Sequence, residues 1–216
     1  MKTKKILFIC LLIMNAAEAF ADEGKFAAAI EKGLGLLKTA ESPDQYQLAA
    51  NHFERIAAAE TKEWLPLYYA AYSNLYSGLT GKDKEKQDEL YDKALSQLKL
   101  AEAISKDNSE ILAMQGYVVL MKLAVDPMGR GRTMMPEGMS FLSQAKKLNP
   151  ENPRTYLIEG QFMFFMPEAF GGGKVAAKPI LEAGNEKYAA EVPASSILPQ
   201  WGKQRLEQLL KMCGEK

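Results

Sequence analysis

The chain has 216 residues, of which 47% are hydrophobic and 25% charged, a composition typical of a globular protein with a sizeable apolar core. Its 27 basic residues balance 27 acidic ones, so we expect no general attraction to nucleic acid or to anionic lipid, because both require a basic surface. One histidine, His52, and two cysteines, Cys10 and Cys213, are too few for a zinc site of the usual type, and we expect no metal and no cofactor.

The first 21 residues have the layout of a cleaved secretory signal. Three lysines among the first five residues precede an apolar run from Ile6 to Met14, and Ala19 and Ala21 place small residues before the expected cut. This run is too short to cross a bilayer, which requires about 20 apolar residues. We therefore expect cleavage after Ala21 and export to the periplasm. The remaining chain, residues 22–216, is expected to form a single domain without a membrane span.

The rest of the chain shows the apolar periodicity of helices. Apolar positions three and four apart recur in segments rich in Ala, Leu, Lys and Glu, and no stretch keeps the alternation typical of a strand. A capping side chain followed by proline marks two of the starts, at Ser42 and at Asn152. The pattern predicts helices near residues 23–39, 44–59, 62–77, 85–105, 109–124, 136–147, 153–165, 174–187 and 202–213. The predicted fold class is all-α.

Two sets of landmarks repeat with one period. Ala71, Gly116 and Gly160 are small residues in helices that carry Tyr or Phe, and they are separated by 45 and 44 residues. The partner helices carry a small residue, an apolar residue four later, and a small or apolar residue after three more. These triplets are Ala49, Phe53 and Ile56, then Ala94, Leu98 and Ala101, then Gly138, Leu142 and Ala145. We expect the small residues at places where two helices touch.

These spacings resemble the tetratricopeptide repeat family, whose unit of 34 residues is a helix hairpin. The copy most similar to the motif carries Gly138, Leu142, Ala145, Pro150, Tyr156 and Gly160. The resemblance covers roughly residues 25–190. It implies an α-solenoid of about four helix hairpins in which each hairpin buries one face against the next, with the last helix as a C-terminal cap. A different α-solenoid, or an irregular helical bundle, remains the alternative.

The copies depart from the motif between the two helices of a hairpin. Ala71 and Ala94 are 23 residues apart and Gly116 and Gly138 are 22 apart, about ten more than in the motif. We interpret the extra residues as inserted turns, which the pattern places at residues 77–88, 126–136 and 167–174.

The inserted turns contain candidate surface residues. Glycine and proline are frequent in the second and third turns, and most such segments only interrupt helices. Binding of a phosphate or of a partner remains open, because glycine-rich turns can present backbone amides to an anion. Arg130 and Arg132 are candidates for gripping a carboxylate, and Phe170 is a candidate apolar contact.

The resemblance also implies a concave groove lined by the first helix of each hairpin. In this register, the groove candidates are Tyr68, Tyr72, Tyr76, Tyr117, Met121, Arg154, Gln161, Phe164 and Phe165. The first three follow each other at a spacing of four, so they share one helix face. Soluble proteins rarely leave a large apolar patch bare. The groove is therefore either occupied by segments of the chain itself, such as the last helix, or open to a ligand.

No catalytic constellation is visible in the sequence. His52 lies beside Phe53 in a helix, the carboxylates alternate with lysines, and no nucleophile motif is present. We predict a non-enzymatic exported scaffold that binds a protein or peptide partner through the aromatic groove, as the resemblance implies.

The alternative is a small-molecule binding component associated with a solute transport system. It would enclose a small apolar ligand among Tyr72, Tyr117, Phe164 and Phe170. A pocket closed by the C-terminal helix would favour the small molecule, whereas an open channel would favour the peptide.

Overall fold

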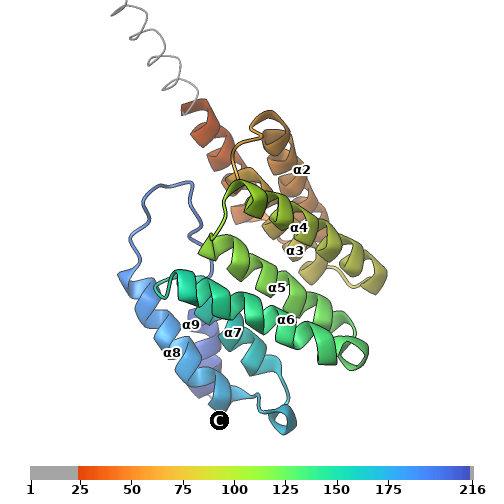
Figure 1. The fold of residues 1–216 in the computed structure, drawn as a ribbon, viewed down its shortest axis with the longest axis vertical. Helices are drawn as coiled ribbons and strands as arrows, with labels where there is room; N and C mark the ends of the chain where they lie inside the picture. Colours follow the sequence, from red (N-terminus) through yellow and green to blue (C-terminus); the bar gives the residue numbers. More distant parts are fainter. Residues whose placement is uncertain (1–23, 215–216) are drawn as a thin grey trace, which may run out of the picture.

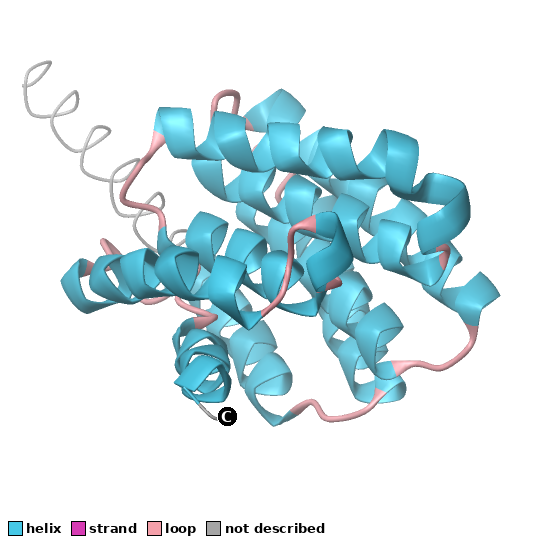
Figure 2. Ribbon diagram, turned by 90° about the horizontal axis from the view of Figure 1, so that it is seen from below, coloured by secondary structure: helices cyan, strands magenta, loops and turns pink. Residues whose placement is uncertain are grey.

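The computed structural model describes residues 24–214, and these form helices joined by turns and loops (Figures 1 and 2). No strand occurs within this range. The signal segment at 1–21 and its cleavage site after Ala21 lie outside the described residues. Within the described residues, no helix has both the length and the apolar character needed to cross a membrane.

The helices follow the predicted order. A first helix covers residues 24–39. It is followed by α2 (Pro43–Ala59), α3 (Leu65–Thr80), α4 (Lys84–Ile104), α5 (Ser109–Val125), α6 (Pro127–Leu148), α7 (Pro153–Phe165), the short 3₁₀ helix η1 (Glu168–Phe170), α8 (Lys174–Ala190) and α9 (Lys203–Gly214).

Side-chain caps explain where several helices begin. Ser42 and Gln45 form a capping box at α2, with Pro43 in the first turn. Asn108 accepts hydrogen bonds from two backbone N–H groups at the start of α5, and Asn152 accepts one at the start of α7. These side chains satisfy N–H groups that have no partner inside the helix.

The small residues lie where paired helices touch, as predicted. A Cβ added at Gly116 would lie 3.0 Å from the backbone oxygen of Gly138 in α6, and one added at Gly160 would lie 2.5 Å from Leu181 in α8. Ala71 is fully buried in the core that α3 shares with α2 and α4. The described residues therefore form four stacked helix hairpins, an α-solenoid-like arrangement.

The last helix caps this stack. Leu206 and Leu209 of α9 are fully buried in a cluster with Leu157 of α7 and Leu181 of α8. This contact covers the apolar end of the final hairpin, as the terminal element of a helical stack must.

The interpretation of two inserted turns is wrong. α3 extends to Thr80 and α4 begins at Lys84, so only residues 81–83 join these helices in place of the expected turn at 77–88. Residues 127–136, expected as a turn, belong to α6. Asp126 caps this helix by accepting a hydrogen bond from the backbone N–H of Gly129, and a proline fits its first turn. The extra residues lengthen helices instead of forming loops.

The third turn is irregular, as predicted. Residues 167–173 contain η1 and two glycines with positive φ, Gly171 at 84° and Gly173 at 94°. The backbone N–H of Gly173 donates to the carbonyl of Met163, which folds the loop back onto α7.

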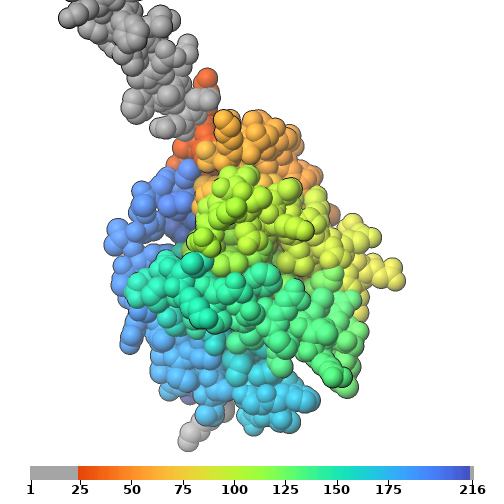
Figure 3. Space-filling view, in the orientation of Figure 1, coloured from red at the N-terminus to blue at the C-terminus, as the bar shows by residue number. Residues whose placement is uncertain are grey.

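Residues 191–202 connect α8 to α9, and we call this segment the strap. It passes along the side of the molecule next to the N-terminal helices (Figure 3). The hydroxyl of Ser196 donates to Glu31 of the first helix, and the hydroxyl of Tyr69 in α3 donates to the carbonyl of Ile197. The strap thus joins the last hairpin to the first two.

Candidate ligand-binding groove

Five aromatic rings form a continuous row across α2, α3, α5 and the strap. Tyr46 lies 5.5 Å from Tyr76, measured between ring centroids, and Tyr76 stacks on Tyr72 at 4.5 Å. Trp201 of the strap lies 5.2 Å from Tyr72 and stacks on Tyr117 at 6.2 Å with an interplanar angle of 18°. These separations are typical of favourable ring contacts. We call Tyr46, Tyr72, Tyr76, Tyr117 and Trp201 the aromatic row.

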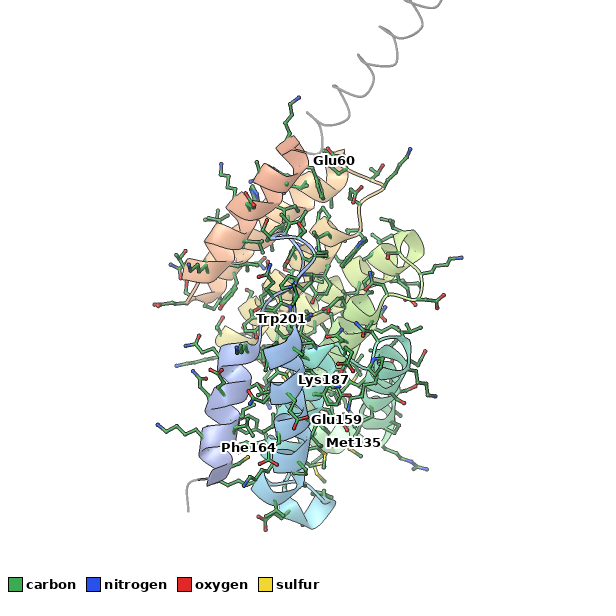
Figure 4. All side chains as sticks on the ribbon, turned by 90° about the vertical axis from the view of Figure 1, so that its left-hand side faces the viewer. Glu60, Met135, Glu159, Phe164, Lys187 and Trp201 are labelled. Atoms are coloured by element: carbon green, nitrogen blue, oxygen red, sulfur yellow. The ribbon has the colours of Figure 1, made fainter. Side chains whose placement is uncertain are left out.

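A polar bridge connects the row to α7 and α9. The Gln161 amide donates to the hydroxyl of Tyr117 at 2.9 Å, and its oxygen accepts from Nε of Arg205 at 2.8 Å. The guanidinium of Arg205 lies over the ring of Phe165, and Phe165 contacts Phe164 at 5.0 Å. Figure 4 shows Trp201 between the N-terminal helices and α9, with Phe164 farther along, close to α9.

The row is only partly covered by other side chains. Tyr46, Tyr72, Tyr76 and Trp201 are half-buried. Tyr117 is 5% exposed to solvent, whereas Phe165 at the α9 end is 61% exposed. The site is therefore neither a sealed core nor an open channel, but an aromatic face with the strap lying across it.

Hydrogen bonds hold both the side chain and the backbone of Trp201. Its indole N–H donates to the hydroxyl of Tyr68 at 2.9 Å, and its carbonyl accepts from the hydroxyl of Tyr188 at 2.9 Å. Tyr68 is fully buried and donates in turn to Glu110. The groove candidate Tyr68 therefore lies beneath the row, where it supports the tryptophan.

Arg154 ties the strap to the helices. It is 4% exposed, its Nε lies 2.8 Å from both carboxylate oxygens of Glu110, and Nη2 donates to Glu191 of the strap at 2.5 Å. These residues line a cavity of about 330 Å³ with Trp64 and Pro199. Burial raises the pKa of the Glu110 carboxyl, while the guanidinium opposes that shift. Arg154 thus positions the strap instead of facing the aromatic row.

The row itself carries no charge near neutral pH. Burial raises the pKa of the Tyr72, Tyr76 and Tyr117 hydroxyls above the ordinary value, so all three remain protonated. The row offers ring faces and neutral hydroxyls, and the guanidinium of Arg205 supplies a positive charge at its α9 end.

The single histidine of the chain lies outside the aromatic row. His52 is half-buried in the first hairpin, where its Nε2 lies 2.8 Å from the carbonyl oxygen of Ala29. Among residues 24–214, no group of three or more His, Cys, Asp or Glu side chains is placed to hold a metal ion.

The predicted loop residues separate into two kinds. Arg130 lies in α6, not in a loop, and grips Asp88 of α4 through two contacts of 2.6 Å. It also donates to the carbonyl of Lys122, so it joins helices within the chain. Arg132, also in α6, and Phe170 in η1 are exposed.

The structure adds residues that the sequence analysis missed. Tyr46, Trp201 and Arg205 all belong to the site. Trp201 and Arg205 lie next to or in the last helix, which the sequence predicted as a cap. The sequence carries one signal that points to Trp201. It is the only aromatic residue between Tyr188 and the final helix, and it stands between Pro199 and Gly202 directly before that helix.

Comparison with known proteins identifies a relative. No family model matches the chain, and no curated protein matches it either. Among solved structures, the HusA haemophore from Porphyromonas gingivalis is 33% identical, with a TM-score of 0.78 over 87% of this chain and 92% of the other. This chain belongs to the HusA family. The likeness to HusA supports a helical repeat-like fold, and the tetratricopeptide assignment stays a resemblance.

Proposed function

We propose that this protein is a haemophore like HusA and that it holds the porphyrin ring of haem against the aromatic row. This is the small-molecule alternative from the sequence analysis, with the ligand class now specified. The continuous row of five rings, in a chain related to a haemophore, is the observation that supports it. Export of the protein, predicted from residues 1–21, is part of the proposal.

The physical chemistry of the row suits a porphyrin. A porphyrin is a flat, largely apolar ring system whose faces stack on aromatic side chains. Each aromatic contact contributes about 0.5–1.5 kcal/mol beyond the area that it buries. Tyrosine and tryptophan also lose little rotamer entropy on binding. The polar tips of Tyr117 and Trp201 already have protein partners in Gln161 and Tyr68.

Recognition then depends on the ring more than on its iron. The row consists of tyrosines and one tryptophan, so it presents no imidazole or thiol to the iron, and burial keeps the hydroxyls of Tyr72, Tyr76 and Tyr117 protonated. We therefore expect iron-free protoporphyrin to bind with an affinity within about tenfold of that for haem, a difference of about 1.4 kcal/mol.

The placement of the strap favours a small ligand over a peptide. Trp201 contacts both Tyr72 and Tyr117, so an extended chain cannot lie along the whole row without displacing it. A flat ligand can stack on the half-buried members of the row, Tyr46, Tyr72, Tyr76 and Trp201. The protein or peptide partner predicted from the sequence remains a prediction.

Titration with haem, followed by absorbance, tests the proposal. Tyr76 stacks on Tyr72 and contacts Tyr46 and Tyr117, so Tyr76→Ala removes the ring that has the most contacts within the row. We expect it to weaken haem binding by about 10-fold or more, since several ring contacts are lost.

Tyr156→Ala is the matched control. Tyr156 is a half-buried tyrosine of α7 that contacts Lys146 and Pro150, away from the row. It should leave the haem affinity within about twofold, because none of its ring contacts belongs to the site. Circular dichroism shows whether each variant is folded. Equal affinities of the two folded variants, or no haem binding by the unaltered protein, would refute the proposal.

A further inference from the structure

Arg205 is a half-buried arginine without a carboxylate partner among the described residues. The other arginines that are not exposed, Arg130 and Arg154, behave differently. Arg154 grips Glu110 and Glu191, and Arg130 grips Asp88, each through charge-assisted hydrogen bonds. The guanidinium of Arg205 is therefore held in place without a carboxylate partner and is available to an anionic ligand.

The neighbours of Arg205 orient its guanidinium group. Nε donates to the oxygen of Gln161, and the Gln161 amide nitrogen is itself committed to the hydroxyl of Tyr117. Cζ of Arg205 lies 5.7 Å from the ring centre of Phe165, within the range of a cation–π contact. Nη1 and Nη2 form no hydrogen bond with the described residues, so both terminal amino groups remain available.

This guanidinium stands where the aromatic row ends. Gln161 links it directly to Tyr117, a member of the row, and the 61% exposed ring of Phe165 lies on its other side. A ligand stacked on the row would place its edge substituents near α9. Carboxylates are the substituents that an arginine fork binds best, because two parallel N–H groups match two carboxylate oxygens.

We infer that Arg205 is the carboxylate-recognition residue of the groove and that its terminal amino groups bind a carboxylate on the edge of the flat ligand. The inference rests on the proposed function and makes it more specific: the preferred ligands are ring systems that carry a free acid. In haem, the group recognised is a propionate. Gln161 acts as the positioning residue that holds the guanidinium at the end of the row.

A comparison of two probes with two proteins tests this role. The probes are protoporphyrin IX, which carries two free propionates, and its dimethyl ester, which carries none. The proteins are the unaltered chain and Arg205→Gln, each titrated at low and at high salt. We expect the unaltered protein to bind the acid about 10 to 100 times more tightly than the ester, the range for hydrogen bonds to charged groups. In Arg205→Gln this preference should disappear, with the ester affinity unchanged.

Two further variants serve as controls. Lys203→Gln removes an exposed cation two residues away in the same helix and should leave both affinities unchanged. Arg205→Lys keeps the charge but loses the planar fork, so it should keep only part of the preference for the acid. It also provides a second test if Arg205→Gln does not fold.

The outcomes separate the two proposals. If Arg205→Gln weakens acid and ester equally, Arg205 acts through its packing on Phe165, and the inference is overturned. If the unaltered protein binds both probes equally well, the inference fails while porphyrin binding stands. If the unaltered protein binds neither probe nor haem, the proposed function itself fails.

Discussion

At the scale of single residues, burial determines the state of the tyrosines. Desolvation raises the pKa of Tyr69, Tyr72, Tyr91 and Tyr188 well above the ordinary value of 10.0. Because the folded chain keeps these protons at a pH where the unfolded chain releases them, the free energy of unfolding must fall as the pH rises above 10.

An alkaline titration tests whether the free energy of unfolding falls as the pH rises above 10. We expect the tyrosinate absorbance to appear together with the loss of helical circular dichroism, because most of the buried hydroxyls ionise only when the chain unfolds. Ionisation of most tyrosines near pH 10 with the helices intact would contradict the burial of these side chains.

The residues of the groove were predictable where helical spacing alone decides their position. Tyr72 and Tyr76 share a face because they are four residues apart, and the repeat period brings Tyr117 to the same side. The charge partners of Arg154, itself a groove candidate from the sequence, were not predictable in this way. Arg154 meets Glu110 and Glu191, which are 44 and 37 residues away, and such charge partners depend on how distant helices pack.

At the scale of elements, α6 provides a matched pair of glycines. A Cβ added at Gly131 meets nothing within 4 Å, whereas one added at Gly138 would lie 2.7 Å from Leu120 in the core. Gly131→Ala should raise the free energy of unfolding by about 0.5–1 kcal/mol, because alanine loses less backbone entropy in a helix. Gly138→Ala should lower it by about 1–3 kcal/mol through overpacking.

Urea denaturation of both variants measures these two effects. Each variant introduces the same methyl group into the same helix, so a difference in sign isolates the packing of α6 against α5. Stabilisation by both substitutions would show that α6 does not approach α5 as closely as the structure describes.

The same helix explains why part of the fold was mispredicted. Its first half carries Pro127, Gly129, Gly131 and Pro136, residues that weaken a helix and are typical of turns. Tertiary contacts outweigh the low helix propensity of this segment, because Arg130 bonds this half of α6 to α4 and to α5. The small residues at the helix contacts were predicted correctly because close packing of two helices tolerates few side chains.

At the scale of the whole molecule, the strap changes how a stack of hairpins is held together. In a simple stack each hairpin touches only its neighbours, so the ends can unfold separately. Here the strap contacts Glu31 of the first helix, Tyr69 of α3 and Arg154 of α7. These contacts couple the two ends and favour unfolding as one unit.

Trp201→Ala tests this coupling. Removal of a large, partly buried aromatic side chain should lower the free energy of unfolding by about 2–4 kcal/mol. It should also let α7, α8 and α9 exchange amide hydrogens earlier than the N-terminal helices, which hydrogen-exchange mass spectrometry resolves.

Val192→Ala serves as the control for this variant. Val192 belongs to the same strap but is 89% exposed, so its effect should stay within about 0.5 kcal/mol. If Trp201→Ala instead speeds exchange uniformly along the chain, the strap does not couple the ends of the stack.

The position of Trp201 also allows porphyrin binding to be followed without an added fluorescent label. The chain contains two tryptophans, and this one lies between Tyr72 and Tyr117 at the proposed site. Porphyrins absorb at the wavelengths where indole emits, so a bound ring would quench its fluorescence by energy transfer. The tryptophan fluorescence intensity would thereby measure the fraction of protein that holds a porphyrin. Transfer of the porphyrin to an acceptor would be followed in real time as a rise in this fluorescence.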